Sequence, residues 1–65
     1  MIIDNYHYGN HIIEIHEHPI YHDFEFVVKN NDGKVILTSL HPYEDASTTM
    51  GAAEIKINLK NNDNN

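Results

Sequence analysis

The stretch from Phe24 to Thr38 constrains the fold more than any other part of the sequence. Phe24-Glu25-Phe26-Val27-Val28-Lys29 is rich in strand-forming residues, and Lys34–Leu40 is a second run of the same kind. The segment between them, Asn30-Asn31-Asp32-Gly33, ends in Asp-Gly, which adopts the positive φ of a hairpin turn at little cost. Two such runs around this turn predict an antiparallel hairpin.

Side chains alternate along a strand, so this hairpin divides into two faces. We predict one apolar face, which carries Phe24, Phe26, Val28, Val35 and Leu37. The opposite face then carries Asp23, Glu25, Val27, Lys29, Ile36 and Thr38.

A second hairpin is predicted before the first. Gly9-Asn10 separates two β-rich runs, Ile2–Tyr8 and His11–Glu17, and Pro19 ends the second run because proline cannot donate to a ladder. In that second run the apolar face gains Ile13 and Ile15, whereas the polar face gains Glu14, His16 and His18. Whether residues 1–8 form a strand is left open, so the sheet has three or four strands.

The pattern changes to a helical period after Pro42. Asp45 is a candidate N-cap, and the apolar stripe that follows consists of Ala46, Met50, Ala53 and Ile57, widened by Ala52, Ile55 and Leu59. Residues 55–60 also alternate as a strand would, so we predict helix to about Lys56 and leave the rest open. Residues 61–65 have no apolar group to bury, and a disordered tail is expected.

These elements predict an α+β fold: a three- or four-stranded antiparallel meander with one C-terminal helix packed across one face. The order of elements from Ile13 onward resembles the YegP-like domain of unknown function. The resemblance is carried by the run from Phe24 to Ser39, then Tyr43, Ala46-Ser47 and Gly51-Ala52. Residues 1–60 are then a single YegP-like domain, in which 1–12 form an extension that the family lacks and that contains a possible extra strand.

The resemblance implies a meander crossed by one helix. It also implies a homodimer, because members of that family with a single copy of the domain look like homodimers. It implies no activity and no catalytic residues. Independently, one helix covers only one face of a small sheet and leaves edge strands unpaired, which also predicts a two-fold dimer. The predicted interface residues are Val27 and Ile36 on the uncovered face, with Tyr8 and Tyr21 as surface anchors.

Composition excludes several classes of protein. The 65 residues contain no cysteine, so disulfides and thiolate-bound zinc are excluded. Ten carboxylates stand against four lysines and no arginine, which disfavours direct nucleic-acid binding. The first residues lack a signal-peptide pattern, and no apolar run reaches membrane-spanning length. We therefore expect a cytoplasmic protein without a membrane partner.

Three of the six histidines, His16, His18 and His22, lie close together in the sequence. His16 and His18 are two residues apart in a predicted strand and point the same way, so with His22 they are candidate metal ligands. The alternative is that they populate the solvent-exposed face of that strand. No motif with known zinc spacing is present, so no cofactor is expected. No catalytic residue is predicted either, because neither a nucleophile motif nor an oxyanion loop is visible.

Three functions fit these observations. The first is a small, non-catalytic homodimeric interaction module with a possible protein partner. The second is an acidic inhibitor from a mobile element, which occupies the basic groove of a target protein. The third is a metal- or pH-responsive module built on the histidines.

Overall fold

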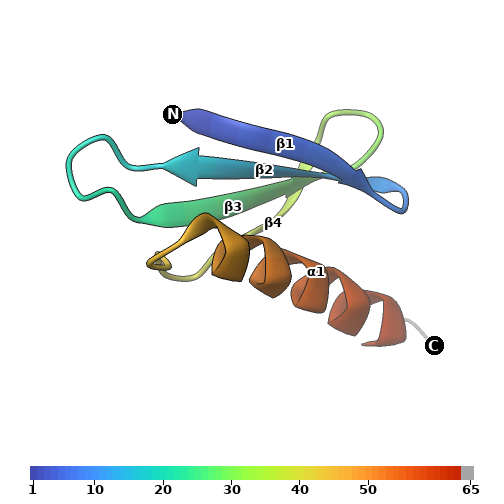
Figure 1. Ribbon diagram of the computed structural model, residues 1–65. Coiled ribbons are helices and arrows are strands. Elements are labelled where there is room, and N and C mark those ends of the chain that lie inside the picture. Colours follow the sequence, from blue (N-terminus) through green and yellow to red (C-terminus); the bar gives the residue numbers. More distant parts are fainter. Residues whose placement is uncertain (64–65) are drawn as a thin grey trace.

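The computed structural model describes residues 1–63 and contains four strands followed by one helix (Figure 1). The strands are β1 (Ile2–Tyr8), β2 (His11–Glu17), β3 (Phe24–Lys29) and β4 (Val35–Thr38), and the helix is α1 (Ala46–Asp63). The strands form one antiparallel sheet in the order β1-β2-β3-β4, and α1 packs against β2 and β3 from one side. The predicted α+β meander is confirmed, and residues 2–8 supply its fourth strand.

The hydrophobic core lies between the sheet and α1. Its fully buried sheet residues are Ile13, Ile15, Phe26 and Val28, and its helix residues are Ala53 and Ile57. Phe24, Leu37 and Met50 pack around this centre. The strand residues of the centre follow the predicted alternation, so the covered face is the one expected from the sequence.

Helix α1 begins as predicted, after Asp45. The Oδ1 atom of Asp45 accepts a hydrogen bond of 2.6 Å from the backbone N–H of Thr48, which satisfies a donor left over at the helix start and holds the pKa of Asp45 below its usual value. The hydroxyl of Thr49 donates to the Asp45 carbonyl at 2.7 Å and is fully buried. Thr49 therefore contributes to the interface with the sheet, which the apolar stripe alone did not predict.

The later part of α1 corrects two expectations. Residues 55–60 are helical, and the helix extends through Asn61 and Asn62, which were expected in a disordered tail; residues 64 and 65 lie outside the described part of the chain. The predicted widening of the apolar stripe is confirmed for Ala52, which packs against the core, and wrong for Ile55 and Leu59, which are 60% and 57% exposed. The sheet is only a few strands wide, so the helix buries a narrow stripe against it.

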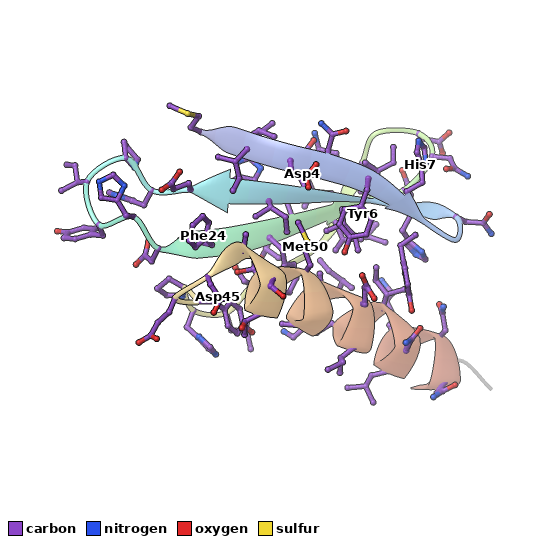
Figure 2. The ribbon with its side chains drawn as sticks, viewed as in Figure 1. Asp4, Tyr6, His7, Phe24, Asp45 and Met50 are labelled. Atoms are coloured by element: carbon purple, nitrogen blue, oxygen red, sulfur yellow. The ribbon has the colours of Figure 1, made fainter. Side chains whose placement is uncertain are left out.

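Two tyrosines tie the edge strand β1 to α1. The Tyr6 hydroxyl donates a 2.7 Å hydrogen bond to Glu54, and the amide of Asn58 donates to the Tyr8 hydroxyl at 3.1 Å. Figure 2 shows Tyr6 on the helix side of β1. Burial, together with the hydrogen bond to Glu54, raises the pKa of Tyr6 well above its usual value. Tyr8 was predicted as a surface anchor for a partner, but it packs against the core and bonds within its own chain.

Strand β4 contains a bulge that changes which side chains it buries. Leu37 lies opposite Val28 and on the predicted covered face, but Val35, not Ile36, lies opposite Lys29. The extra residue turns Val35 to the side of Lys29, where it is 49% exposed, and lets Ile36 pack against the core. The prediction that Val35 is on the covered face and Ile36 on the uncovered face is therefore wrong.

The other edge strand is also irregular. The register of β1 with β2 shifts between Ile2 and Asp4, so Ile3 is an extra residue. Bulges twist and interrupt an edge, and they reduce its capacity to pair with another strand. Both edges of this sheet, β1 and β4, carry such an interruption.

Candidate functional site

The side of the sheet turned away from α1 is the candidate site, and we call it the open face (Figure 1). The strand register assigns its residues: Ile2, Asn5, His7, Ile12, Glu14, His16, Glu25, Val27, Lys29, Val35 and Thr38. Its two half-buried apolar residues, Ile12 and Val27, are not among those that pack against the buried core cluster. Within residues 1–63, the open face is thus one whole side of the sheet without a second layer.

Glu14 organises the middle of the open face. Its Oε2 atom accepts a bond from the Lys29 ammonium at 2.8 Å, and its Oε1 atom lies 3.0 Å from Nε2 of His16. The Glu14 side chain is only 14% exposed, so these contacts are shielded from water. The hydrogen bonds from Lys29 and then His16 lower the pKa of the Glu14 carboxyl, which is ionised at neutral pH.

Apolar side chains flank this charged centre. Val27 lies directly opposite Glu14 on β3, and Ile12 lies opposite Lys29 on β2; both are half-buried. Ile2 and Val35, toward the two edges, are each 49% exposed. Buried charges are tolerated when they are paired, and here the central carboxylate already has two partners. A second layer can therefore cover the open face without leaving Glu14 unpaired.

A shallow hollow of about 230 Å³ lies at one end of the open face. It is lined by Met1, His16, Glu17, His18, Pro19, Glu25 and Val27. The terminal amine of Met1 donates to the Glu17 carbonyl at 3.1 Å, and the Glu17 N–H donates to the Met1 carbonyl at 2.8 Å, so the start of the chain forms one wall. The hollow contains no serine, threonine or cysteine side chain as a nucleophile.

The three candidate metal ligands do not come together. His16 pairs with Glu14, whereas Nδ1 of His22 lies 3.2 Å from Glu17. Nδ1 of His18 accepts backbone N–H bonds from Ile20 at 3.2 Å and Tyr21 at 3.3 Å, so that nitrogen is already in use. Among residues 1–63, no three histidine or carboxylate side chains are arranged to hold a metal ion.

The loop that joins β2 to β3 is compact and presents two large apolar side chains. His18 fixes it through the bonds to Ile20 and Tyr21 and through a ring contact of 4.8 Å with Tyr21. The His18 carbonyl also accepts from the N–H of His22, which has φ 57°. Ile20 and Tyr21 are about three-quarters exposed, at 74% and 75%. Tyr21 is thus at the surface, as its predicted role as an anchor requires.

Of the four predicted interface residues, the structure places Val27 on the open face and Tyr21 at the tip of this loop. Ile36 and Tyr8 lie on the covered side. Sequence reasoning did not single out Lys29 as the partner of Glu14. Alternation along β3 places Lys29 on the same face as Glu25 and Val27, but it does not identify which carboxylate Lys29 bonds.

Comparison with known proteins adds no relative: no protein-family model, no curated protein and no solved structure matches the chain. The resemblance to the YegP-like domain therefore stays a prediction. Within residues 1–63, no helix combines the length and the apolar character needed to cross a membrane.

Proposed function

We propose that this protein is a small homodimeric interaction module without catalytic activity, and that two copies meet through the open face. The observation that carries the proposal is the half-buried apolar pair Ile12 and Val27 on a sheet face that no other layer of the described chain covers. A chain of this length buries only ~60% of the surface of its unfolded form, so a second copy supplies apolar burial that the monomer lacks.

The open face is a better candidate for the contact than either edge of the sheet. β1 is interrupted at Ile3 and β4 at Ile36, and such bulges disfavour the continuous ladder that edge-to-edge pairing needs. Packing of two sheets face to face needs no free backbone groups and occurs at a separation of about 10 Å. The side chains of the open face then form the interface.

The distribution of charge favours this module over an acidic inhibitor of a nucleic-acid-binding groove. Such an inhibitor needs carboxylates that follow the path of a phosphate chain. Here all four lysines, Lys29, Lys34, Lys56 and Lys60, lie toward the end of the molecule where β3 and α1 finish. A surface that gathers all its lysines toward one end does not resemble a uniformly anionic strand. The metal-responsive alternative has no converging ligands to support it within residues 1–63.

Sedimentation equilibrium of the untagged protein tests the proposal. We expect a dimer at tens of micromolar and a shift to monomer for Val27→Lys, with the milder Val27→Thr intermediate. The matched control is Ile55→Lys, because Ile55 is 60% exposed on the helix, away from the open face. Circular dichroism verifies that each variant is folded. A wild-type protein that stays monomeric at several hundred micromolar, or equal effects of Val27→Lys and Ile55→Lys, contradicts the proposal.

A further inference from the structure

The charges of the open face point to the relative orientation of the two copies, an inference that rests on the proposed function. We infer that the copies pack with their β3 strands antiparallel, so that Glu25 of each copy meets Lys29 of the other on either side of Val27. The occupant of the open face is then a second copy of this chain in one defined orientation.

The pattern along β3 has the symmetry that such a contact needs. Glu25, Val27 and Lys29 are successive residues of the open face, opposite His16, Glu14 and Ile12 on β2. A two-fold axis that lies midway between the two sheets, at right angles to β3 and level with Val27, places Glu25 of one copy opposite Lys29 of the other. Each copy then presents a negative group where its partner presents a positive one, which is the self-complementarity of an isologous interface.

Charged residues elsewhere in the molecule are distributed in the same direction as Glu25 and Lys29 along β3. Five carboxylates surround the end where β3 and α1 begin: Glu17, Asp23, Glu25, Glu44 and Asp45. The four lysines lie toward the opposite end, where three acidic residues, Asp32, Glu54 and Asp63, accompany them (Figure 1). Antiparallel packing brings the anionic end of each copy to the cationic end of the other, whereas parallel packing brings like charges together.

The two side chains are available for this contact. In the described part of the chain Glu25 is exposed and takes part in no ion pair. Lys29 bonds Glu14 at 2.8 Å, but an ammonium has three donors, so it can serve Glu14 and the partner's Glu25 together. Two sheets about 10 Å apart leave a gap that a glutamate and a lysine side chain span from opposite sides.

Charge reversal at these two positions tests the orientation. In Glu25→Lys both contacts become lysine against lysine, and we expect self-association at low salt to weaken by roughly tenfold or more. Lys29→Glu gives glutamate against glutamate and a similar loss. The double variant, Glu25→Lys with Lys29→Glu, restores both pairs and keeps a lysine diagonal to Glu14, so it self-associates as the wild type does.

A mixture gives the sharpest readout. Glu25→Lys and Lys29→Glu each repel their own copies but complement each other at both contacts, so an equimolar mixture forms a heterodimer. Native mass spectrometry distinguishes that heterodimer from either homodimer once one variant is uniformly labelled with ¹⁵N, because the two substitutions alone hardly change the mass. Glu44→Lys and Lys60→Glu change the net charge by the same amounts away from the open face, and their mixture shows no such preference. The preference weakens as salt screens the pairs.

The outcomes separate this inference from the proposed function. If the wild type does not dimerise, or Val27→Lys has no effect, the proposed function fails and the orientation fails with it. If the wild type dimerises through Val27 but the Glu25→Lys variant self-associates as tightly as the wild type, the antiparallel orientation is contradicted. The proposed homodimeric module is then unaffected. In a parallel arrangement like charges already face each other in the wild type, so Glu25→Lys leaves the affinity unchanged.

Discussion

The two faces of this sheet are built from the same four strands, yet they are stabilised in different ways. The covered face buries Ile13, Ile15, Phe26 and Val28 completely against α1. The open face has Glu14 at its centre, held by Lys29 and His16, with half-buried valine and isoleucine side chains beside it. One face is a packed core, and the other is a surface whose central carboxylate, Glu14, is already paired.

This difference separates folding from association. Residues of the covered face contribute to the unfolding free energy through close packing, where each lost methylene leaves a cavity. Residues of the open face stay in contact with water in the monomer, and truncating them leaves no enclosed cavity. Substitutions on the covered face should therefore affect folding, and substitutions on the open face should affect mainly self-association.

The largest contrast is expected between neighbours on β3. Phe26→Ala removes a fully buried ring and should lower the free energy of unfolding by ~3–5 kcal/mol, which is comparable to the whole stability of a domain of this size. Val27→Ala should cost at most ~1 kcal/mol, because Val27 is only half-buried. Urea unfolding followed by circular dichroism, at a concentration where the protein is monomeric, measures both.

If Phe26→Ala and Val27→Ala lower the free energy of unfolding equally, the proposed difference between the covered face and the open face is contradicted. Phe26→Leu serves as a softer variant if Phe26→Ala does not fold at all. Its loss must still exceed that of Val27→Ala.

Glu14→Gln tests whether the open face contributes to folding through its charges. Lys29 and then His16 hold the pKa of Glu14 below its usual value of 4.5, so ionised Glu14 stabilises the folded state above that pH. We expect a loss of ~1 kcal/mol at pH 7, where the bonds to Lys29 and His16 are charge-assisted. The difference from the wild type should shrink as the pH falls below about 4, through the folded-state pKa. A difference that does not change with pH assigns the loss to packing instead.

Tyr6→Phe makes the corresponding test on the covered side. Removing the hydroxyl breaks the 2.7 Å bond to Glu54 and should cost ~1 kcal/mol at neutral pH. Burial and Glu54 raise the pKa of Tyr6 in the folded state, so its contribution is fully present below the unfolded value of about 10 and is lost as the pH rises above it. The wild type should therefore lose stability above pH 10 more steeply than Tyr6→Phe. Parallel alkaline unfolding curves for the two proteins contradict this.

The covered face could be predicted from the sequence, because the alternation of apolar residues along a strand and the N-cap at Asp45 are local signals. Ile13, Ile15, Phe26 and Val28 are buried as predicted, and the helix starts at the predicted residue. The sequence did not predict that Val35 is on the open face and Ile36 on the covered face. This placement follows from a bulge, which depends on the register of β4 with β3 and on the space in the core. The length of α1 was not predictable either. Residues 55–60 alternate as a strand would, so the local pattern fits both a strand and a helix, and packing against the sheet selects the helix.

The open face was predicted in outline and missed in detail. Its strand positions follow from alternation, so Glu14, His16 and Val27 were placed correctly. Their partners were not predictable, because a glutamate on a strand has several neighbours across and diagonal to it. The histidines show the same limit: His18 lies one residue beyond β2 and turns its Nδ1 to the loop backbone, which no spacing rule predicts.

His22 belongs to neither face, and its substitution should have the smallest effect. It holds φ 57°, a conformation that asparagine tolerates better than histidine, and its contact with Glu17 is solvent-exposed. We expect His22→Asn to raise the free energy of unfolding by ~0.5 kcal/mol, with His7→Asn, on the open face of β1, as the neutral control. Zinc should stabilise the wild type and His22→Asn equally little, because the three histidines do not converge. A zinc-dependent rise in melting temperature that His22→Asn abolishes would instead show that the imidazoles act as one site.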